Sequence, residues 1–132
     1  MDDPETANIY TELARTALDG LILSTIHLGG AMSGADVQRR INTTHGVNIS
    51  PGAVYPRLQS LADDGLLCKR ETPNETLYGV DDHHRTQQRF KTLAECHVEL
   101  ADTYIDACAT EHTEFDTDAL RRRLYEHVTE SE

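Results

Sequence analysis

The chain has 132 residues, with 23 acidic against 12 basic side chains and a net charge of −11. At this length we expect one domain with its own core. No apolar run is long enough to cross a membrane, and the acidic N-terminus lacks the basic and then apolar pattern of a signal peptide. P-loop, GxSxG and HExxH motifs are absent, which argues against an enzyme. These features predict a cytoplasmic protein that does not bind membranes.

The acidity also indicates an environment. Only two lysines accompany ten arginines, and acids outnumber both. This balance is typical of proteins that work in molar salt, where a Debye length of about 3 Å screens repulsion between exposed carboxylates. An acidic protein from ordinary salt is the alternative interpretation.

The N-terminal half predicts two helices. The first runs from Pro4 to about Leu28, begins at the N-cap Asp3 and ends at a glycine pair. Its apolar residues form a wide stripe, so much of its surface should be buried. Ser33 caps the second helix, and Gly46 closes it.

The segment from Ser50 to Val80 carries the clearest pattern. Ser50 is an N-cap, Pro51 occupies the first helical position, and Gly65 ends the helix with positive φ. Residues 66–70 and 76–80 then alternate as two strands around a four-residue turn. A helix followed by a two-stranded wing is typical of a winged helix-turn-helix. The predicted fold is therefore mainly α with a small β-hairpin.

A long helix should follow the hairpin and reach about Ala109, with a last helix at 118–128. The apolar residues of the long helix are spaced alternately by three and four positions in a heptad-like seam, which predicts a homodimer. An intramolecular contact is the alternative use of that seam. We expect a winged helix-turn-helix domain over 1–82, including the N-terminal helix, and a helical dimerisation region over 83–132. The predicted dimerisation residues are Phe90, Leu93, His97, Leu100 and Tyr104.

The same residues resemble those of a known family. The matching pattern consists of Ser50, Gly52, Val54-Tyr55-Pro56, Leu58, Leu61 and Gly65-Leu66, preceded by Ser33-Gly34 and residues 35–41. This pattern is similar to the core of the PadR-like winged-helix transcription factors and covers residues 21–84. The chain departs from it at Ala35, where many members carry Tyr, and in a short wing without a Gly-rich turn.

The resemblance implies a homodimer that represses or tunes nearby genes. The acidic composition is similar to that of the salt-loving archaeal branch, where a response to reactive oxygen species is the expected signal. The operator, the inducing signal and the choice between repression and activation stay open.

The segment 33–62 holds three arginines and one aspartate, so it carries +2 while the rest of the chain carries −13. A weakly basic island on an acidic body fits a DNA-binding face, although chance clustering is the alternative. The predicted DNA contacts are Arg39, Arg40, Ser50, Gly52, Ala53, Tyr55, Arg57, Lys69, Arg70, Thr72 and Asn74.

These residues have different expected roles. The small residues that begin the third helix allow close approach to a phosphate at the helix N-terminus. Tyr55 is expected on a phosphate, with a half-buried core position as its alternative. Arg57 should reach a base edge or a second phosphate, Arg39 and Arg40 the DNA backbone, and the wing residues the minor groove or its phosphates.

Few of these side chains can make bidentate base contacts, so DNA shape should supply part of the specificity. Inorganic cations are expected to bridge acidic patches to phosphates, which predicts a shallow salt dependence. No cofactor is expected.

Two further features, the cysteines and a run of three arginines, have alternative interpretations. The cysteines Cys68, Cys96 and Cys108 form no metal-binding spacing and should mostly be packed as reduced thiols. A redox sensor at Cys68, beside Lys69 and Arg70, is the alternative. Arg121-Arg122-Arg123 should be solvated or paired with carboxylates, with a phosphate contact as the alternative.

Two rival functions stay open beside the regulator. One is a metal- or ligand-sensing regulator in which His83-His84 gather with Cys96 or His97 at a dimer interface. The other is a winged-helix protein-interaction module that binds no DNA, which the acidic charge would favour.

Overall fold

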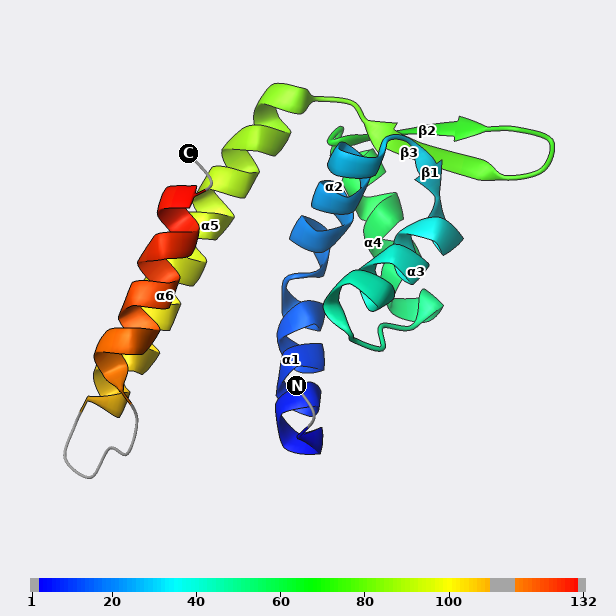
Figure 1. The fold of residues 1–132 in the computed structure, drawn as a ribbon. Helices are drawn as coiled ribbons and strands as arrows, with labels where there is room; N and C mark the ends of the chain where they lie inside the picture. Colours follow the sequence, from blue (N-terminus) through cyan, green and yellow to red (C-terminus); the bar gives the residue numbers. More distant parts are fainter. Residues whose placement is uncertain (1–2, 110–115, 131–132) are drawn as a thin grey trace. The chain divides into compact units, whose positions relative to one another are not determined.

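A computed structural model describes residues 3–109 and 116–130, with side chains as far as Glu126. Those residues form six helices and three short strands (Figure 1). They divide into two compact units, of which the first ends at Phe90 and the second begins at Lys91. The fold is mainly α with a small antiparallel sheet, as the sequence predicts.

The predicted first helix is two helices, α1 (Pro4–Thr16) and α2 (Leu18–Gly29). Ala17 between them departs from helical geometry, with φ −96° and ψ 15°. The Thr16 hydroxyl donates to the Leu13 carbonyl at 2.8 Å, and such bonds bend helices. The prediction of one continuous helix is therefore wrong. The sequence did not reveal the bend, because the apolar pattern continues across it. The predicted cap is confirmed, since Asp3 accepts from the Glu5 amide at 3.3 Å.

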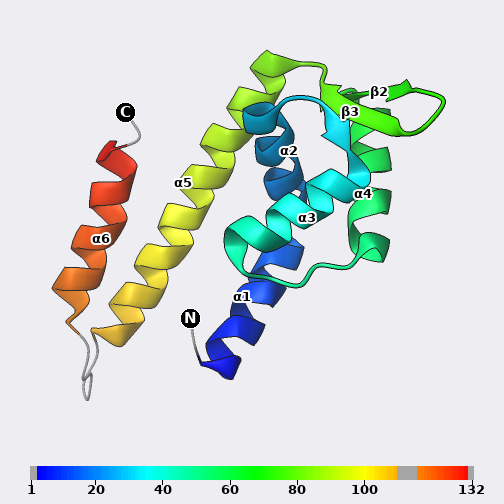
Figure 2. The same cartoon turned by 45° about the vertical axis from the view of Figure 1, so that its right-hand side comes forward.

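Helices α3 (Gly34–His45) and α4 (Pro51–Asp63) form the helix-turn-helix (Figure 2). Both begin with a serine cap: Ser33 Oγ accepts from the Asp36 amide, and Ser50 Oγ accepts from the Ala53 amide. Gly46, at φ 64°, ends α3. Each of these predicted boundaries is confirmed.

The turn between α3 and α4 is fixed by a side chain. Asn42 Oδ1 accepts from the Ile49 amide at 2.8 Å, and Asn42 Nδ2 donates to the Ile49 carbonyl at 3.0 Å. Gln38 Nε2 also donates to that carbonyl, at 3.1 Å. Ile49 is fully buried, so these bonds satisfy backbone groups that water does not reach.

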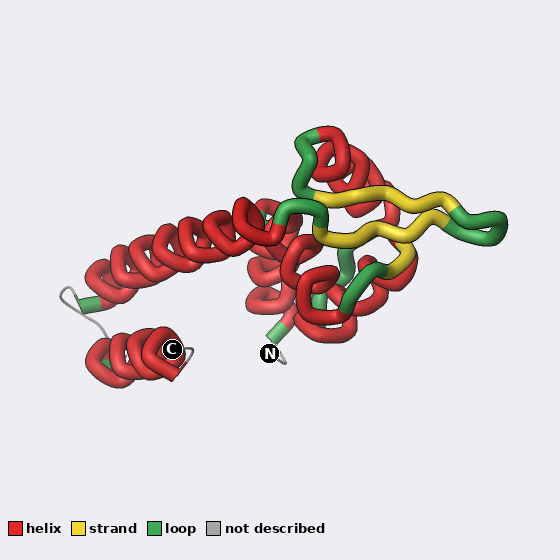
Figure 3. The backbone as a smooth tube through the Cα atoms, turned by 90° about the horizontal axis from the view of Figure 1, so that it is seen from above, coloured by secondary structure: helices red, strands yellow, loops and turns green. Residues whose placement is uncertain are grey.

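The sheet has the strand order β1-β3-β2, and Figure 3 shows its two longer strands side by side. Strands β2 (Leu67–Glu71) and β3 (Thr76–Val80) form the predicted hairpin, with β2 shifted by one residue. The two-residue strand β1 (Met32–Ser33) pairs with the other edge of β3. It was not predicted, because two residues are too few for an alternating pattern.

The core of the first unit lies where α2, α3, α4 and the sheet meet. Its fully buried side chains include Ile22, Val37, Ile41, Val54 and Leu58. The apolar faces predicted for α3 and α4 are thus the buried faces, which leaves the other side of α4 exposed. Within the described residues no helix is long and apolar enough to span a bilayer.

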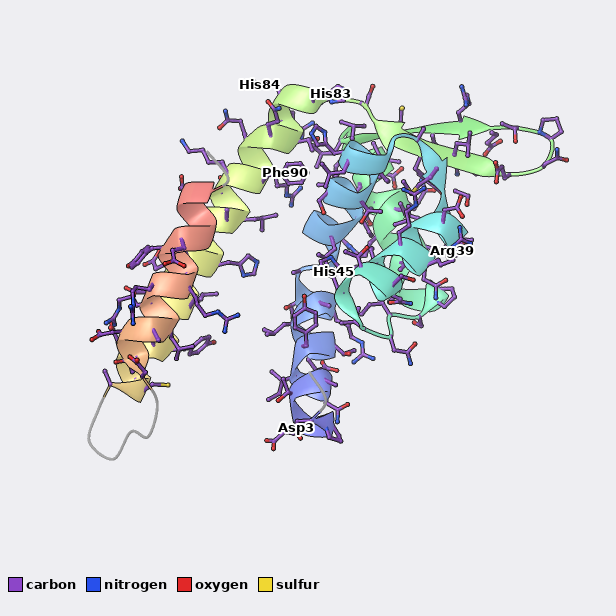
Figure 4. All side chains as sticks on the ribbon, in the orientation of Figure 1. Asp3, Arg39, His45, His83, His84 and Phe90 are labelled. Atoms are coloured by element: carbon purple, nitrogen blue, oxygen red, sulfur yellow. The ribbon has the colours of Figure 1, made fainter. Side chains whose placement is uncertain are left out.

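The first turns of α5 (His83–Cys108) belong to the first unit. Asp82 caps the helix by accepting from the Arg85 amide at 3.0 Å. Arg85 donates to the Asp64 carbonyl at 3.1 Å, and Thr86 is fully buried. Phe90 packs on the core (Figure 4). These contacts place the first turns of α5 in the first compact unit. That unit ends at Phe90, whereas the boundary expected from sequence lies at 82.

The second unit contains the rest of α5 and α6 (Thr117–Glu130). Asp116 caps α6 by accepting from the Ala119 amide at 2.9 Å. Arg121 pairs with Asp102 and Asp106 of α5, and its hydrogen bond to Asp102 raises the pKa of the guanidinium. For Arg121, the predicted pairing with carboxylates is therefore confirmed.

Candidate nucleic-acid interface

The start of α4 is small and open. Ser50, Pro51 and Gly52 are exposed, and Ala53 is half-buried. A Cβ atom built on Gly52 would meet only Ser50 Oγ, at 3.9 Å. The first backbone amides of α4 therefore lie where a bulky group can approach closely, at the positive end of the helix dipole.

Tyr55 lies on the side of α4 that faces the wing. Its ring packs on Gly34, the first residue of α3, where a Cβ would lie 2.6 Å from Tyr55 Cε1. The residue is nevertheless 45% exposed. Tyr55 thus combines its two predicted positions, with part of its surface against protein and part open to a partner.

A pocket of about 440 Å³ opens between this tyrosine, the start of α3 and the wing. Its lining residues mix small, polar and charged side chains: Ser33, Gly34, Ala35, Tyr55, Lys69, Glu75, Thr76 and Tyr78. The pocket joins the helix-turn-helix to the wing in one continuous surface.

Arg57 lies toward a different element, α2. Its Nε and Nη2 atoms donate to the two carboxylate oxygens of Asp19, at 2.7 and 2.8 Å. The hydrogen bond and the negative charge of Asp19 raise the pKa of Arg57. The predicted DNA contact is therefore exposed but already bound to a carboxylate that sequence reasoning did not single out. The two residues are 38 positions apart, so no local pattern links them.

The α3 arginines are exposed, and Figure 4 labels Arg39 on the outer side of the helix. Arg39 pairs with Asp36 one turn earlier. Arg40 extends over Gly29 and forms no ion pair among the described residues. Of the two predicted backbone clamps, Arg40 is thus the one with an unbalanced charge.

In the wing, Lys69 Nζ donates to Gln59 Oε1 of α4 at 3.2 Å and lies 3.8 Å from Glu71. Arg70 is exposed and has no ion pair within the part of the chain that the structure describes. Sequence reasoning missed Gln59, although its position one turn after Tyr55 on the exposed side of α4 was a usable signal.

The tip of the wing is a closed turn. The Thr72 amide and hydroxyl both donate to the Glu75 carbonyl, at 2.8 Å each, and the Glu75 amide donates to Thr72 Oγ1 at 3.1 Å. The predicted contact Thr72 therefore shapes the turn, and its neighbour Asn74 is exposed.

The predicted dimer seam has a mixed environment. Leu100 and Tyr104 are 52% and 66% exposed, His97 is exposed and Leu93 is half-buried. Phe90 instead contacts His27 of α2, with ring centroids 5.6 Å apart. The exposed part of the seam lies in the second unit.

The cysteines differ from expectation, since Cys68 and Cys96 are exposed and only Cys108 is half-buried. The prediction that they are mostly packed is therefore wrong, because β2 and α5 turn these positions outward. Among the described residues no three or more His, Cys, Asp or Glu side chains gather as metal ligands. The predicted cluster of His83-His84 with Cys96 or His97 lies across a dimer interface, so it involves a second chain and stays an alternative.

A helix-turn-helix whose second helix leads into a two-stranded wing, itself part of a three-stranded sheet, is the fold of winged-helix DNA-binding proteins. No protein-family model matches the chain. Solved structures with this fold do match it.

A transcriptional regulator from Clostridium thermocellum matches with a TM-score of 0.60 and 19% identity, over 76% of this chain and 97% of that one. F93 from STIV, a winged-helix DNA-binding protein, matches with a TM-score of 0.53 and 21% identity, over 65% and 91%. The complex structure of hsRosR-S4 matches with a TM-score of 0.50 and 19% identity, over 92% and 95%. At such identities these likenesses show the winged-helix fold.

Two curated relatives come from salt-loving archaea. The chain is 29% identical to the transcriptional activator GvpE2 of Halobacterium salinarum over 82 residues, which is 62% of this chain and 42% of that protein. It is 33% identical to the transcriptional activator GvpE of Haloferax mediterranei over 69 residues, which is 52% and 36%. The chain therefore spans less than half the length of the curated relatives it matches.

Proposed function

We propose that this chain is a sequence-specific DNA-binding transcription regulator. The observation that carries the proposal is the single surface formed by the open start of α4, Tyr55 and the wing. The major groove of B-DNA admits one helix, and a helix-turn-helix presents its second helix N-terminus first. The names of the two curated relatives, both transcriptional activators, support the same function.

In this proposal α4 enters the major groove and the wing contacts the adjacent minor groove or its phosphates. Ser50, Gly52 and Ala53 approach a phosphate, and Tyr55 donates its hydroxyl to another. Arg40 and Arg70 supply charges that no carboxylate balances within the described residues. The remaining proposed contacts are Arg39, Arg57, Lys69, Thr72 and Asn74.

The proposed active form is a homodimer joined through α5. Leu100 and Tyr104 expose large apolar surfaces in the second unit. Burial of such surface gains about 25 cal/mol per Å². Two copies of the helix-turn-helix would then read two half-sites, as dimeric regulators of this fold class do. The PadR-like resemblance supports this arrangement.

Operation in molar salt belongs to the same proposal. The net charge of −11 and the relatives from salt-loving archaea support it. Binding that depends on counterion release weakens as salt rises. Cations held between acidic side chains and phosphates would keep that salt dependence shallow. An oxidative signal stays a prediction, and the DNA affinity with and without peroxide tests it.

The test is selection of duplexes from a random pool in molar potassium chloride, followed by a gel shift with the selected sequence. We expect one enriched motif and a retained complex at that salt. Failure to bind any duplex, with the fold intact by circular dichroism, would favour the protein-interaction module. A motif that is bound only below molar salt would support the proposed DNA binding and contradict the proposed adaptation to high salt.

A further inference from the structure

From the contacts of Arg57 we infer that Asp19 is a specificity-determining residue, which restrains sequence-independent DNA binding by neutralising the only cation of α4. This inference rests on the proposed DNA-binding function. Arg57 is the one basic residue between Pro51 and Asp63. Its guanidinium is therefore the one full positive charge that α4 itself can offer to a phosphate.

The pair is set by the tertiary fold. Asp19 lies in the first turn of α2, and both of its oxygens accept from Arg57. Such two-point contacts between guanidinium and carboxylate are among the stronger ion pairs and fix the plane of the arginine. The other paired cations of this surface, Arg39 and Lys69, have their carboxylate partners within their own elements. Arg57 is thus the cation of the proposed DNA-binding surface whose neutralisation depends on how two helices pack.

The pair is also accessible. The Arg57 side chain is 45% exposed and that of Asp19 is 27% exposed. Although the contact is bidentate, solvent screens a pair at this exposure, so a competing phosphate can exchange with the carboxylate. A phosphate or base edge that docks closely and in register can therefore recruit Arg57, whereas a loosely bound duplex meets a neutral pair.

The consequence is that competition between Asp19 and DNA for Arg57 helps the protein to distinguish its motif from other duplexes. Sequence-independent binding comes mainly from phosphate neutralisation. Each phosphate contact steepens the slope of log affinity against log salt concentration by about 0.9. A carboxylate that competes for one arginine lowers affinity for every duplex, and most for duplexes that fit poorly. Specificity obtained by penalising wrong partners is a general strategy of natural interfaces.

The experiment compares the parent chain with Asp19→Asn, Asp19→Ala, Arg57→Gln and the double variant Asp19→Asn with Arg57→Gln. Fluorescence anisotropy measures binding to a random 30-base-pair duplex and to the selected motif over a salt series in which every variant stays folded. Glu12→Gln is the matched control, because it removes the same charge and frees Arg15 on α1.

We expect both Asp19 variants to bind the random duplex more tightly, with a salt slope steeper by about 0.9. A tenfold dilution of salt should then gain about eightfold more affinity than it gains for the parent chain. The ratio of motif to random affinity should fall. In the Arg57→Gln background, Asp19→Asn should change neither slope nor ratio.

Three results would overturn the inference: weaker random binding by both Asp19 variants, an equal gain from Glu12→Gln, or the same gain with and without Arg57. In each of these cases the parent chain still binds its motif, so the proposed function survives. A parent chain that binds no duplex at all would remove both the inference and the proposed function.

Discussion

Nζ of Lys69 on β2 donates to Oε1 of Gln59 on α4 across 3.2 Å, and Gln59 Nε2 donates to Asp63 at 3.0 Å. The amide is thus held at both ends, and it links the wing to the proposed recognition helix. Lys69 also lines the pocket between α3, α4 and the wing.

The first prediction concerns that lysine. Lys69→Gln should make the salt dependence of DNA binding shallower by about one phosphate contact and weaken binding to all duplexes alike. Anisotropy over a salt series measures both effects. Lys91→Gln, which removes an exposed lysine of the second unit, is the control. An unchanged slope for Lys69→Gln would exclude a phosphate contact by this residue.

The second prediction concerns the turn between α3 and α4. Asn42→Ala should lower the free energy of unfolding by about 1–3 kcal/mol, because the buried Ile49 amide loses its acceptor. The Ile49 carbonyl keeps its bond from Gln38. Urea unfolding in high salt measures the change, and Thr43→Ala at the exposed neighbouring position is the control. Equal stability of the two variants would refute the role of this side chain.

The third prediction compares two glycines near helix starts. Gly34→Ala should cost about 1–3 kcal/mol of stability, because its Cβ would lie 2.6 Å from Tyr55 and 3.1 Å from Leu58. Gly52→Ala has open space and should stabilise the fold by about 0.4–1 kcal/mol. Thermal unfolding of both variants provides the measurement. A neutral Gly34→Ala would mean that Tyr55 moves aside without cost.

The fourth prediction concerns the proposed dimer. Leu100→Glu places a charge in the exposed part of the seam and should convert a dimer to a monomer, because burial of an unpaired charge is costly. Light scattering coupled to size exclusion measures the mass directly. Glu95→Gln, on the same helix but outside the seam, should leave the mass unchanged. A monomeric parent chain would contradict the proposal itself.

Local chemistry made much of the fold predictable. The caps Asp3, Ser33 and Ser50 and the glycines Gly46 and Gly65 mark helix ends through bonds within a few residues. Sequence reasoning failed where distant residues decide the structure. The bend at Ala17 and the pairing of β1 with β3 depend on packing that no short window contains.

The candidate site shows the same division. The exposure of Tyr55 and Arg57 followed from the helical period of α4. The partner of Arg57 did not, because Asp19 is 38 residues away on another helix. Composition identified a basic segment over 33–62, but only the tertiary structure shows that Asp19, outside it, offsets one of its charges.

Ser33 ends β1, where it pairs with Leu77, and it also caps α3. The helix-turn-helix therefore starts at a residue whose strand partner, Leu77, comes after α4 in the sequence. The pairing of Ser33 with Leu77 joins residues 44 positions apart, and such nonlocal contacts raise the contact order of a small domain and slow its folding. Helices α3 and α4 are for this reason not a portable module: a graft that omits β3 would carry the two helices without the strand that anchors the first of them.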